Sequence, residues 1–155
     1  MMNVEDRLRE LNLTLPPVNK PLAAYVPAVS AGSLVFISGQ LPLQDGKLVY
    51  SGKVGRDLSV EEGQAAARIA VINCLAALRD VVPSWESIDS IVKITGYIQC
   101  EGDFYQQPQV LNGASELLEQ IFSSRGCHAR VALGVNALPL NAACEVEMIA
   151  QLKIS

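Results

Sequence analysis

The residues best suited to chemistry gather near the C-terminus, between Cys127 and Ala150. Arg130 opens one apolar alternation, and Glu145 and Glu147 interrupt a second alternation at positions that share a face. Charges on core strands need a reason in a chain with 50% hydrophobic and 18% charged residues, because a buried charge is costly without a partner. A guanidinium fork matches a carboxylate with two parallel hydrogen bonds, so a carboxylate is a natural partner for this arginine.

Residue types alone leave alternatives open for each of these groups. Arg130 is either the cation of an ion pair at the rim of the sheet or a clamp for a ligand carboxylate. Glu145 and Glu147 either form salt bridges between subunits or face a ligand. His128, the single histidine, is a candidate for lining a cleft, since imidazole exchanges protons near neutral pH. Cys127 is a poor candidate nucleophile, because no second histidine is available to activate it.

Composition narrows the class of protein. A chain of 155 residues is most simply one domain, placed here over residues 1–155, with residues 1–21 as an N-terminal extension packed on it. The net charge of −4, with basic residues scattered singly, argues against nucleic-acid binding, since phosphate affinity needs clustered Lys and Arg. The high apolar fraction fits an oligomer whose subunits cover part of one another's surface.

Location and metal content are predicted in the same way. The sequence has no uninterrupted apolar run of about 18 residues, which argues against a membrane span. The charged N-terminus has no apolar signal-peptide core, so we expect a cytoplasmic protein. The four cysteines are far apart and share one histidine, which argues against a zinc site and predicts reduced thiols.

Helical periodicity predicts the elements that support these residues. Residues 4–11 carry the apolar stripe of a short helix. Ser59 and Glu62 have capping-box spacing at the start of a long helix that ends near residue 82. A second long helix is predicted over residues 104–124, with Pro108 in its first turn and Gly126 as its C-cap.

Strands are predicted at residues 34–40, 88–100, 131–135 and 144–148, the last two forming a hairpin joined by a Leu-Pro turn. The first strand ends in Ser38-Gly39-Gln40, where Gly39 indicates either a bulge or the close approach of a ligand. Asp45-Gly46 predicts a further hairpin turn. The element order indicates an α+β fold in which two helices cover one face of a mixed sheet. The other face is then either polar or in contact with other subunits.

Two segments resemble one protein family. Leu34–Pro42 is one; the other contains Ala129-Arg130-Val131, Leu138-Pro139 and Glu145–Ala150. Together they are similar to the Rid family, also called YjgF or endoribonuclease L-PSP-like, over residues 22–154. The resemblance implies a chorismate-mutase-like α+β fold and a cytoplasmic homotrimer with three ligand clefts between neighbouring subunits. Those subunits would cover the free sheet face.

The resemblance also implies a chemistry. The best-known branch hydrolyses reactive enamines and imines, such as 2-aminoacrylate, to a 2-keto acid and ammonia without a metal or organic cofactor. Arg130 would bind the substrate carboxylate, and Glu145 would orient or deprotonate the attacking water. The remaining residues expected at the pocket are Tyr25, Ser38, Gly39 and His128.

The chain departs from the family pattern at three positions. His128 stands where active deaminases carry proline, Ala132 where they often carry cysteine, and Gly102 where our register expects a ligand-binding asparagine. These departures indicate a divergent branch and keep open a non-catalytic trimer that binds small carboxylates. Endoribonuclease activity, which the family's older name suggests, has less support, because the chain is acidic and has no evident nucleophile–base pair.

Overall fold

A computed structural model describes residues 3–21 and 23–155. Its centre is a five-stranded sheet with the order β1-β2-β7-β5-β6. The strands are β1 (Ala28–Ala31), β2 (Leu34–Gln40), β5 (Ile88–Gln99), β6 (Ala129–Val135) and β7 (Cys144–Leu152). β5 and β6 are parallel, whereas the other neighbours are antiparallel. The α+β class with a mixed sheet, predicted from the sequence, is confirmed.

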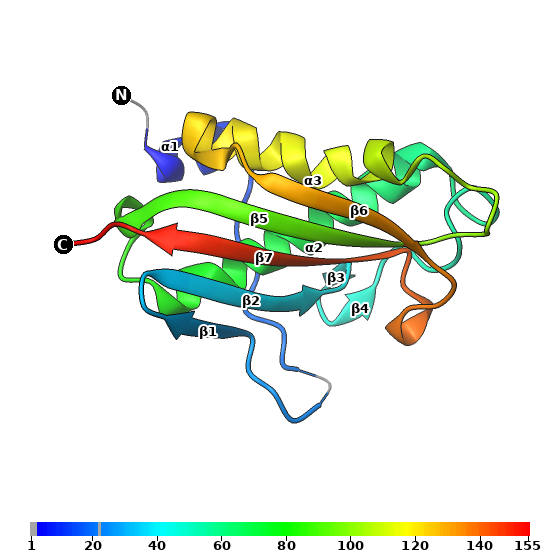
Figure 1. Ribbon diagram of the computed structural model, residues 1–155, viewed down its shortest axis with the longest axis horizontal. Helices are drawn as coiled ribbons and strands as arrows, with labels where there is room; N and C mark the ends of the chain where they lie inside the picture. The colour runs from blue at the N-terminus through cyan, green and yellow to red at the C-terminus, as the bar shows by residue number, and fades with distance from the viewer. Residues whose placement is uncertain (1–2, 22) are drawn as a thin grey trace.

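Two long helices, α2 (Val60–Val81) and α3 (Gln107–Phe122), lie together on one side of this sheet (Figure 1). The short helix α1 (Val4–Glu10) packs beside α3. Ser59 and Glu62 form the predicted capping box, each side chain bonding the other residue's backbone. None of the described helices is both long and apolar enough to cross a bilayer.

The C-terminal end of α3 differs from the prediction. Ser123, with a φ of 54°, caps the helix, and a short 3-10 helix, η2 (Ser123–Gly126), follows. The predicted C-cap at Gly126 is therefore wrong. Gly126 is needed instead for packing, because a Cβ there would overlap the carbonyl of Leu118.

Small residues bring the helices close to the sheet and to each other. Gly96 of β5 lies under Leu111 of α3, and Gly113 of α3 lies against the backbone of Gln64 in α2, so that a Cβ at either glycine would overlap its neighbour. Leu111 is fully buried. Truncating such a leucine to alanine costs about 2–5 kcal/mol of stability, so this layer holds β5 and its neighbours firmly in place.

The predicted hairpin between the last two strands is wrong, because β5 lies between β6 and β7. Residues 93–98 of β5 pair with β6 on one edge and with β7 on the other. A 3-10 turn, η3 (Pro139–Asn141), carries the chain across, with Leu140 and Asn141 at positive φ. Two apolar alternations around a Leu-Pro turn look the same in the sequence whether the two strands pair with each other or flank a third strand. The long-range pairing with β5 decides between these two topologies. The hairpin predicted at Asp45-Gly46 does form, between β3 (Leu43–Gln44) and β4 (Lys47–Leu48).

The sheet face away from α2 and α3 carries exposed apolar side chains toward both of its edges. Val29, Phe36, Val131 and Leu133 are 52%, 42%, 39% and 44% exposed. Strand pairing places each of them on the face opposite to the buried Ile94 and Met148. We call these four residues the open face. The strands between them, β7 and β5, place Glu145, Glu147 and Lys93 on the same face. Groups of exposed apolar side chains often mark interaction sites.

Candidate functional site

The residues predicted to form the site fall into two groups within the chain. The Arg130 cluster contains Arg130 and His128, joined by Ser115, which was not predicted, at the junction of β6 and α3. The Glu145 cluster consists of Glu145, Gly39, Ser38 and Tyr25, where β7 meets the end of β2.

In the Arg130 cluster, a half-buried guanidinium is held by α3. Its Nη1 donates to the Oγ of Ser115 at 3.0 Å, and its Nη2 donates to the carbonyl of Pro108 at 3.2 Å. A guanidinium carries five N–H donors, so three remain for a ligand. The part of the chain that the structure describes offers Arg130 no ion pair, and the interpretation as a rim ion pair therefore finds no support within one chain.

His128 is fixed behind this arginine. Its Nε2 lies 2.9 Å from the Oγ of Ser115, and its Nδ1 lies 2.6 Å from the carbonyl oxygen of Gly126. Both ring nitrogens are thus engaged inside the chain. Ala132, one of the departures from the family pattern, follows on the same face of β6 as Arg130, because alternate residues of a strand share a face.

In the Glu145 cluster, a bulge brings a glycine against a carboxylate. The register between β2 and β7 shifts between Ile37 and Gln40, so Ser38 and Gly39 lie in the irregular stretch. A Cβ on Gly39 would overlap Oε1 of Glu145. Gly39 therefore lies in a bulge and is also approached closely, by the side chain of Glu145 rather than by a ligand.

Tyr25 is joined to this cluster through the segment before β1. The Oγ of Ser38 donates to the carbonyl of Val26 at 2.7 Å, and the backbone N–H of Ser38 donates to the carbonyl of Pro27. A small hollow of about 40 Å³ is lined by Tyr25 and Gly39 together with Asn19 of the N-terminal segment. Tyr25 is 50% exposed, so its ring is available to a ligand or a partner.

The electrostatics of β7 favour a proton acceptor. Burial, and secondarily the charge of Glu147, raises the pKa of Glu145. The hydroxyl of Tyr97 donates to Oε1 of Glu147 at 3.0 Å, and burial followed by this hydrogen bond raises the pKa of Tyr97. Glu147 is thus occupied by a neighbour, whereas the raised pKa of Glu145 makes its carboxylate a stronger proton acceptor than a solvent-exposed glutamate.

The two clusters lie on opposite faces of the sheet. Arg130 pairs with Ile94 of β5, and Glu145 pairs with Tyr97, three positions further along. The register is continuous between these positions, and successive strand residues alternate faces. Arg130 accordingly points toward α3, as its bond to Ser115 requires. One chain cannot place both side chains on one small ligand.

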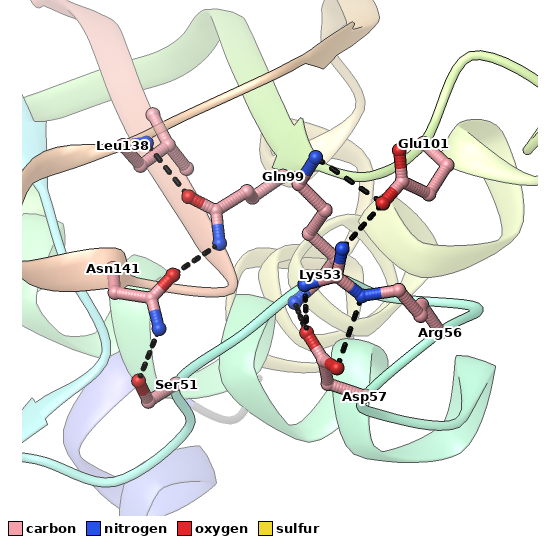
Figure 2. A network of polar contacts seen from close by, with 8 residues as sticks. All are labelled: Ser51, Lys53, Arg56, Asp57, Gln99, Glu101, Leu138 and Asn141. Atoms are coloured by element: carbon pink, nitrogen blue, oxygen red, sulfur yellow. Dashed lines mark hydrogen bonds and ion pairs between the residues drawn. The ribbon is translucent and has the colours of Figure 1, made fainter.

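A separate polar network fixes the connection between β6 and β7 (Figure 2). The buried side chain of Gln99 accepts from the backbone N–H of Leu138 at 2.8 Å and donates to Oδ1 of Asn141 at 2.8 Å. Asn141 in turn donates to the Oγ of Ser51. Beside it, Glu101 bridges Lys53 and Arg56. This network sets the course of the chain into β7, and thereby the position of Glu145.

Sequence reasoning missed two parts of the site. Ser115 gave no signal, because a serine on the flank of an amphipathic helix is ordinary, and the carbonyl of Pro108 carries no side-chain signature. Gly102 is exposed in the loop between β5 and α3, with open space around it.

A metal site would need several ligand side chains in one place. Within residues 3–21 and 23–155, no group of three His, Cys, Asp or Glu residues is placed to hold a metal ion.

Comparison with known proteins identifies the family and the fold. A family model described as "YjgF/chorismate_mutase-like, putative endoribonuclease" matches residues 5–152. "Protein TCP17" of Trypanosoma cruzi is 35% identical over 150 residues, covering 96% of this chain and 94% of that protein. A solved structure from Shewanella oneidensis MR-1 aligns with a TM-score of 0.94 at 36% identity, covering 97% of this chain and 100% of that one.

A more distant relative carries an activity in its name. "Putative reactive intermediate deaminase TdcF" of Escherichia coli K12 is 29% identical over 129 residues, covering 83% of this chain and 87% of TdcF. The crystal structure of E. coli TdcF with bound serine shares the fold, with a TM-score of 0.62 at 24% identity, over 90% of this chain and 94% of that one. On the match of the family model to residues 5–152, and as its two motif segments predicted, the chain belongs to the YjgF/chorismate mutase-like family.

Proposed function

We propose that three copies of this chain assemble so that the Arg130 cluster of one subunit meets the Glu145 cluster of the next. Each of the three resulting clefts would bind a 2-keto or 2-imino acid and hydrolyse reactive enamine or imine intermediates in the cytoplasm. The observation that carries the proposal is the placement of Arg130 and Glu145 on opposite faces of one sheet. A neighbouring subunit is the simplest source of the second cluster that a complete ligand site needs.

The open face supports the assembly. Phe36 and Leu133, each more than two-fifths exposed, would be buried at a sheet-to-sheet contact between subunits. Burial of apolar area contributes about 25 cal/mol per Å², so covering the open face helps to offset the entropy lost on association. Each subunit would then lend a different edge to each of its two neighbours, as a closed ring requires.

The carboxylate of the ligand is recognised by Arg130. Its three free N–H donors, and its charge, unpaired among the described residues, suit a bidentate contact to a carboxylate. A hydrogen bond to a charged group contributes about 1.5–3 kcal/mol. This contact holds the reacting carbon of the ligand at a fixed distance from the Glu145 side of the cleft.

Hydrolysis then needs a placed water and a proton shuttle. 2-Aminoacrylate tautomerises to 2-iminopropanoate, whose imine carbon is electrophilic. Glu145 takes a proton from the water as its oxygen bonds to that carbon, forming a carbinolamine. The protonated carboxyl returns this proton to the nitrogen, which completes the neutral carbinolamine. Glu145 then takes the hydroxyl proton of the carbinolamine and delivers it to the amino nitrogen, the C–N bond breaks, and ammonia leaves as the 2-keto group forms. The raised pKa of Glu145 suits both transfers, and proximity supplies much of the acceleration.

A second function is favoured by the departures from the family pattern. Gly102 and Ala132 provide no polar side chain to the cleft, so a trimer that binds small carboxylates without turnover is the alternative. Both functions share the Arg130 contact.

The decisive assay is stopped-flow hydrolysis of enzymatically generated 2-iminopropanoate, run with the parent protein, Arg130→Ala and Arg130→Lys. We expect acceleration over buffer by the parent and loss of most of it in both variants, since lysine cannot reproduce the fork. If the parent gives no acceleration but pyruvate raises its Tm in an Arg130-dependent way, the protein is a binding protein. Neither acceleration nor a Tm shift would refute the proposed function.

A further inference from the structure

We propose that Ser115 is a positioning residue that fixes the guanidinium of Arg130, and that His128 orients the hydroxyl of Ser115 for this role. The inference rests on the proposed function, because it concerns the group that binds the ligand carboxylate. It concerns residues of α3 and of the turn before β6 that neither the sequence motifs nor the family resemblance assigned to this task.

Donor and acceptor chemistry fixes the direction of the bonds at the two ends of the chain. Arg130 can only donate, so Ser115 Oγ accepts from its Nη1 at 3.0 Å. The hydroxyl hydrogen of Ser115 is then free to point to Nε2 of His128, 2.9 Å away, which accepts it in the arrangement that we propose. The carbonyl of Gly126 can only accept, so Nδ1 of His128 carries the ring hydrogen, at a separation of 2.6 Å. The chain runs from Arg130 to Gly126 with each polar group satisfied.

This arrangement makes His128 a support rather than a ligand-facing acid or base. Both of its nitrogens are used within the chain, one by Ser115 and one by Gly126. The neutral ring with its hydrogen on Nδ1 is the form in which His128 accepts from Ser115, and it is the form that the proposed orienting role requires.

Fixing the guanidinium in advance strengthens ligand binding. Arginine has many rotamers, and ordering such a side chain on binding opposes affinity. Ser115 and the carbonyl of Pro108 hold Nη1 and Nη2 from the α3 side. The remaining N–H groups are thus ordered before the ligand arrives, as a well-built binding site requires.

The first test measures binding of pyruvate by isothermal titration calorimetry, with imine hydrolysis followed in parallel. Ser115→Ala should weaken the affinity on the order of three- to tenfold and raise KM accordingly, while kcat changes less than about twofold. Ser115→Thr keeps the hydroxyl and should restore the parent affinity. Ser124→Ala, at an exposed serine of η2, is the matched control and should change nothing. An unchanged Kd in Ser115→Ala would overturn the proposal.

The second test needs no ligand and separates this proposal from the proposed function. Nitrogen-15 NMR of the parent protein at pH 8 should find His128 protonated on Nδ1, and the side-chain N–H signals of Arg130 should be ordered. Ser115→Ala should speed the solvent exchange of those Arg130 signals, and His128→Phe should do the same, whereas Ser124→Ala should not. A His128 protonated on Nε2, or Arg130 signals indifferent to both variants, would contradict the positioning role even if imine hydrolysis is found.

Discussion

Arg130 and Glu145 occupy opposite faces of one β-sheet, although β5 alone separates their strands. Arg130 points toward α3 and bonds Ser115. Glu145 lies against Gly39 on the other face. A ligand small enough to be a 2-keto acid cannot reach around a sheet, so the proposed function requires a site built from more than one chain.

The contact between Gly39 and Glu145 predicts that a substitution at Gly39 lowers the rate of hydrolysis much more than it lowers stability. In Gly39→Ala, the new Cβ displaces the end of the Glu145 side chain. Because that end is flexible, the stability loss should stay near 1 kcal/mol, whereas imine hydrolysis should fall at least about tenfold, since a general base contributes roughly 10²–10⁴-fold. Urea unfolding and stopped-flow rates measure the two effects. Gly102→Ala, in open space, is the matched control for stability and should leave the free energy of unfolding unchanged.

Glu145 should also leave a pH signature on stability. Its pKa is raised in the folded protein, chiefly by burial, so the fold prefers the protonated form. Stability is then complete below the unfolded glutamate pKa of about 4.3 and is partly lost as pH rises through the raised pKa. Glu145→Gln should therefore be more stable than the parent near pH 8, on the order of 0.5 kcal/mol because the group is half-exposed, and equal to it near pH 3.5.

Denaturant midpoints across this pH range would measure that difference. Glu116→Gln, at an exposed position of α3, provides the comparison. A Glu145→Gln variant that is less stable than the parent near pH 8 would show that the ionised carboxylate stabilises the fold, contrary to the account of its raised pKa.

The network around Gln99 predicts a large loss from one buried amide. Gln99→Leu leaves the N–H of Leu138 and the side chain of Asn141 without their partners. The penalty for such unsatisfied groups is about 1–3 kcal/mol, and the connection into β7 should loosen. Hydrogen exchange of residues 138–147 would detect the loosening, and urea unfolding would measure the loss of stability. Gln44→Leu, at an exposed position, serves as the control, and equal stability of the two variants would remove the structural role assigned to Gln99.

The open face predicts the assembly state. Leu133→Asp places a charge where a neighbouring sheet would pack and should convert the trimer to monomers. Val81→Asp alters a residue on α2 with the same 44% exposure and should leave the trimer intact. Sedimentation equilibrium would report about 50 kDa for three chains of 16.6 kDa. A parent protein that sediments as a monomer at all accessible concentrations would contradict the proposed clefts.

Local signals predicted much of this fold. The start of α2 follows from Ser59 and Glu62, and the β3–β4 turn from Asp45-Gly46, because each depends on residues a few positions apart. The pairing of β6 and β7 could not be predicted in the same way. Whether they meet or flank β5 depends on hydrogen bonds between residues tens of positions apart, which no local pattern encodes.

In the candidate site, too, local relationships could be predicted and long-range ones could not. The structure brings Tyr25, Ser38, Gly39 and Glu145 together, since the segment before β1 bonds Ser38 and the bulge in β2 places Gly39 against Glu145. The separation of Arg130 from Glu145 was not foreseen, since it follows from the strand inserted between them. Ser115 became visible only once α3 was docked beside β6.

Subunit complementation tests the central claim most directly. Arg130→Ala and Glu145→Gln should each be inactive in imine hydrolysis, but a mixed oligomer contains clefts that take Arg130 from one variant and Glu145 from the other. After co-refolding of equal amounts, with mixed oligomers verified by native mass spectrometry, random assembly leaves about a quarter of the clefts intact, so activity should return to roughly that fraction of the parent's. Mixed oligomers without any recovery would contradict a site shared between subunits.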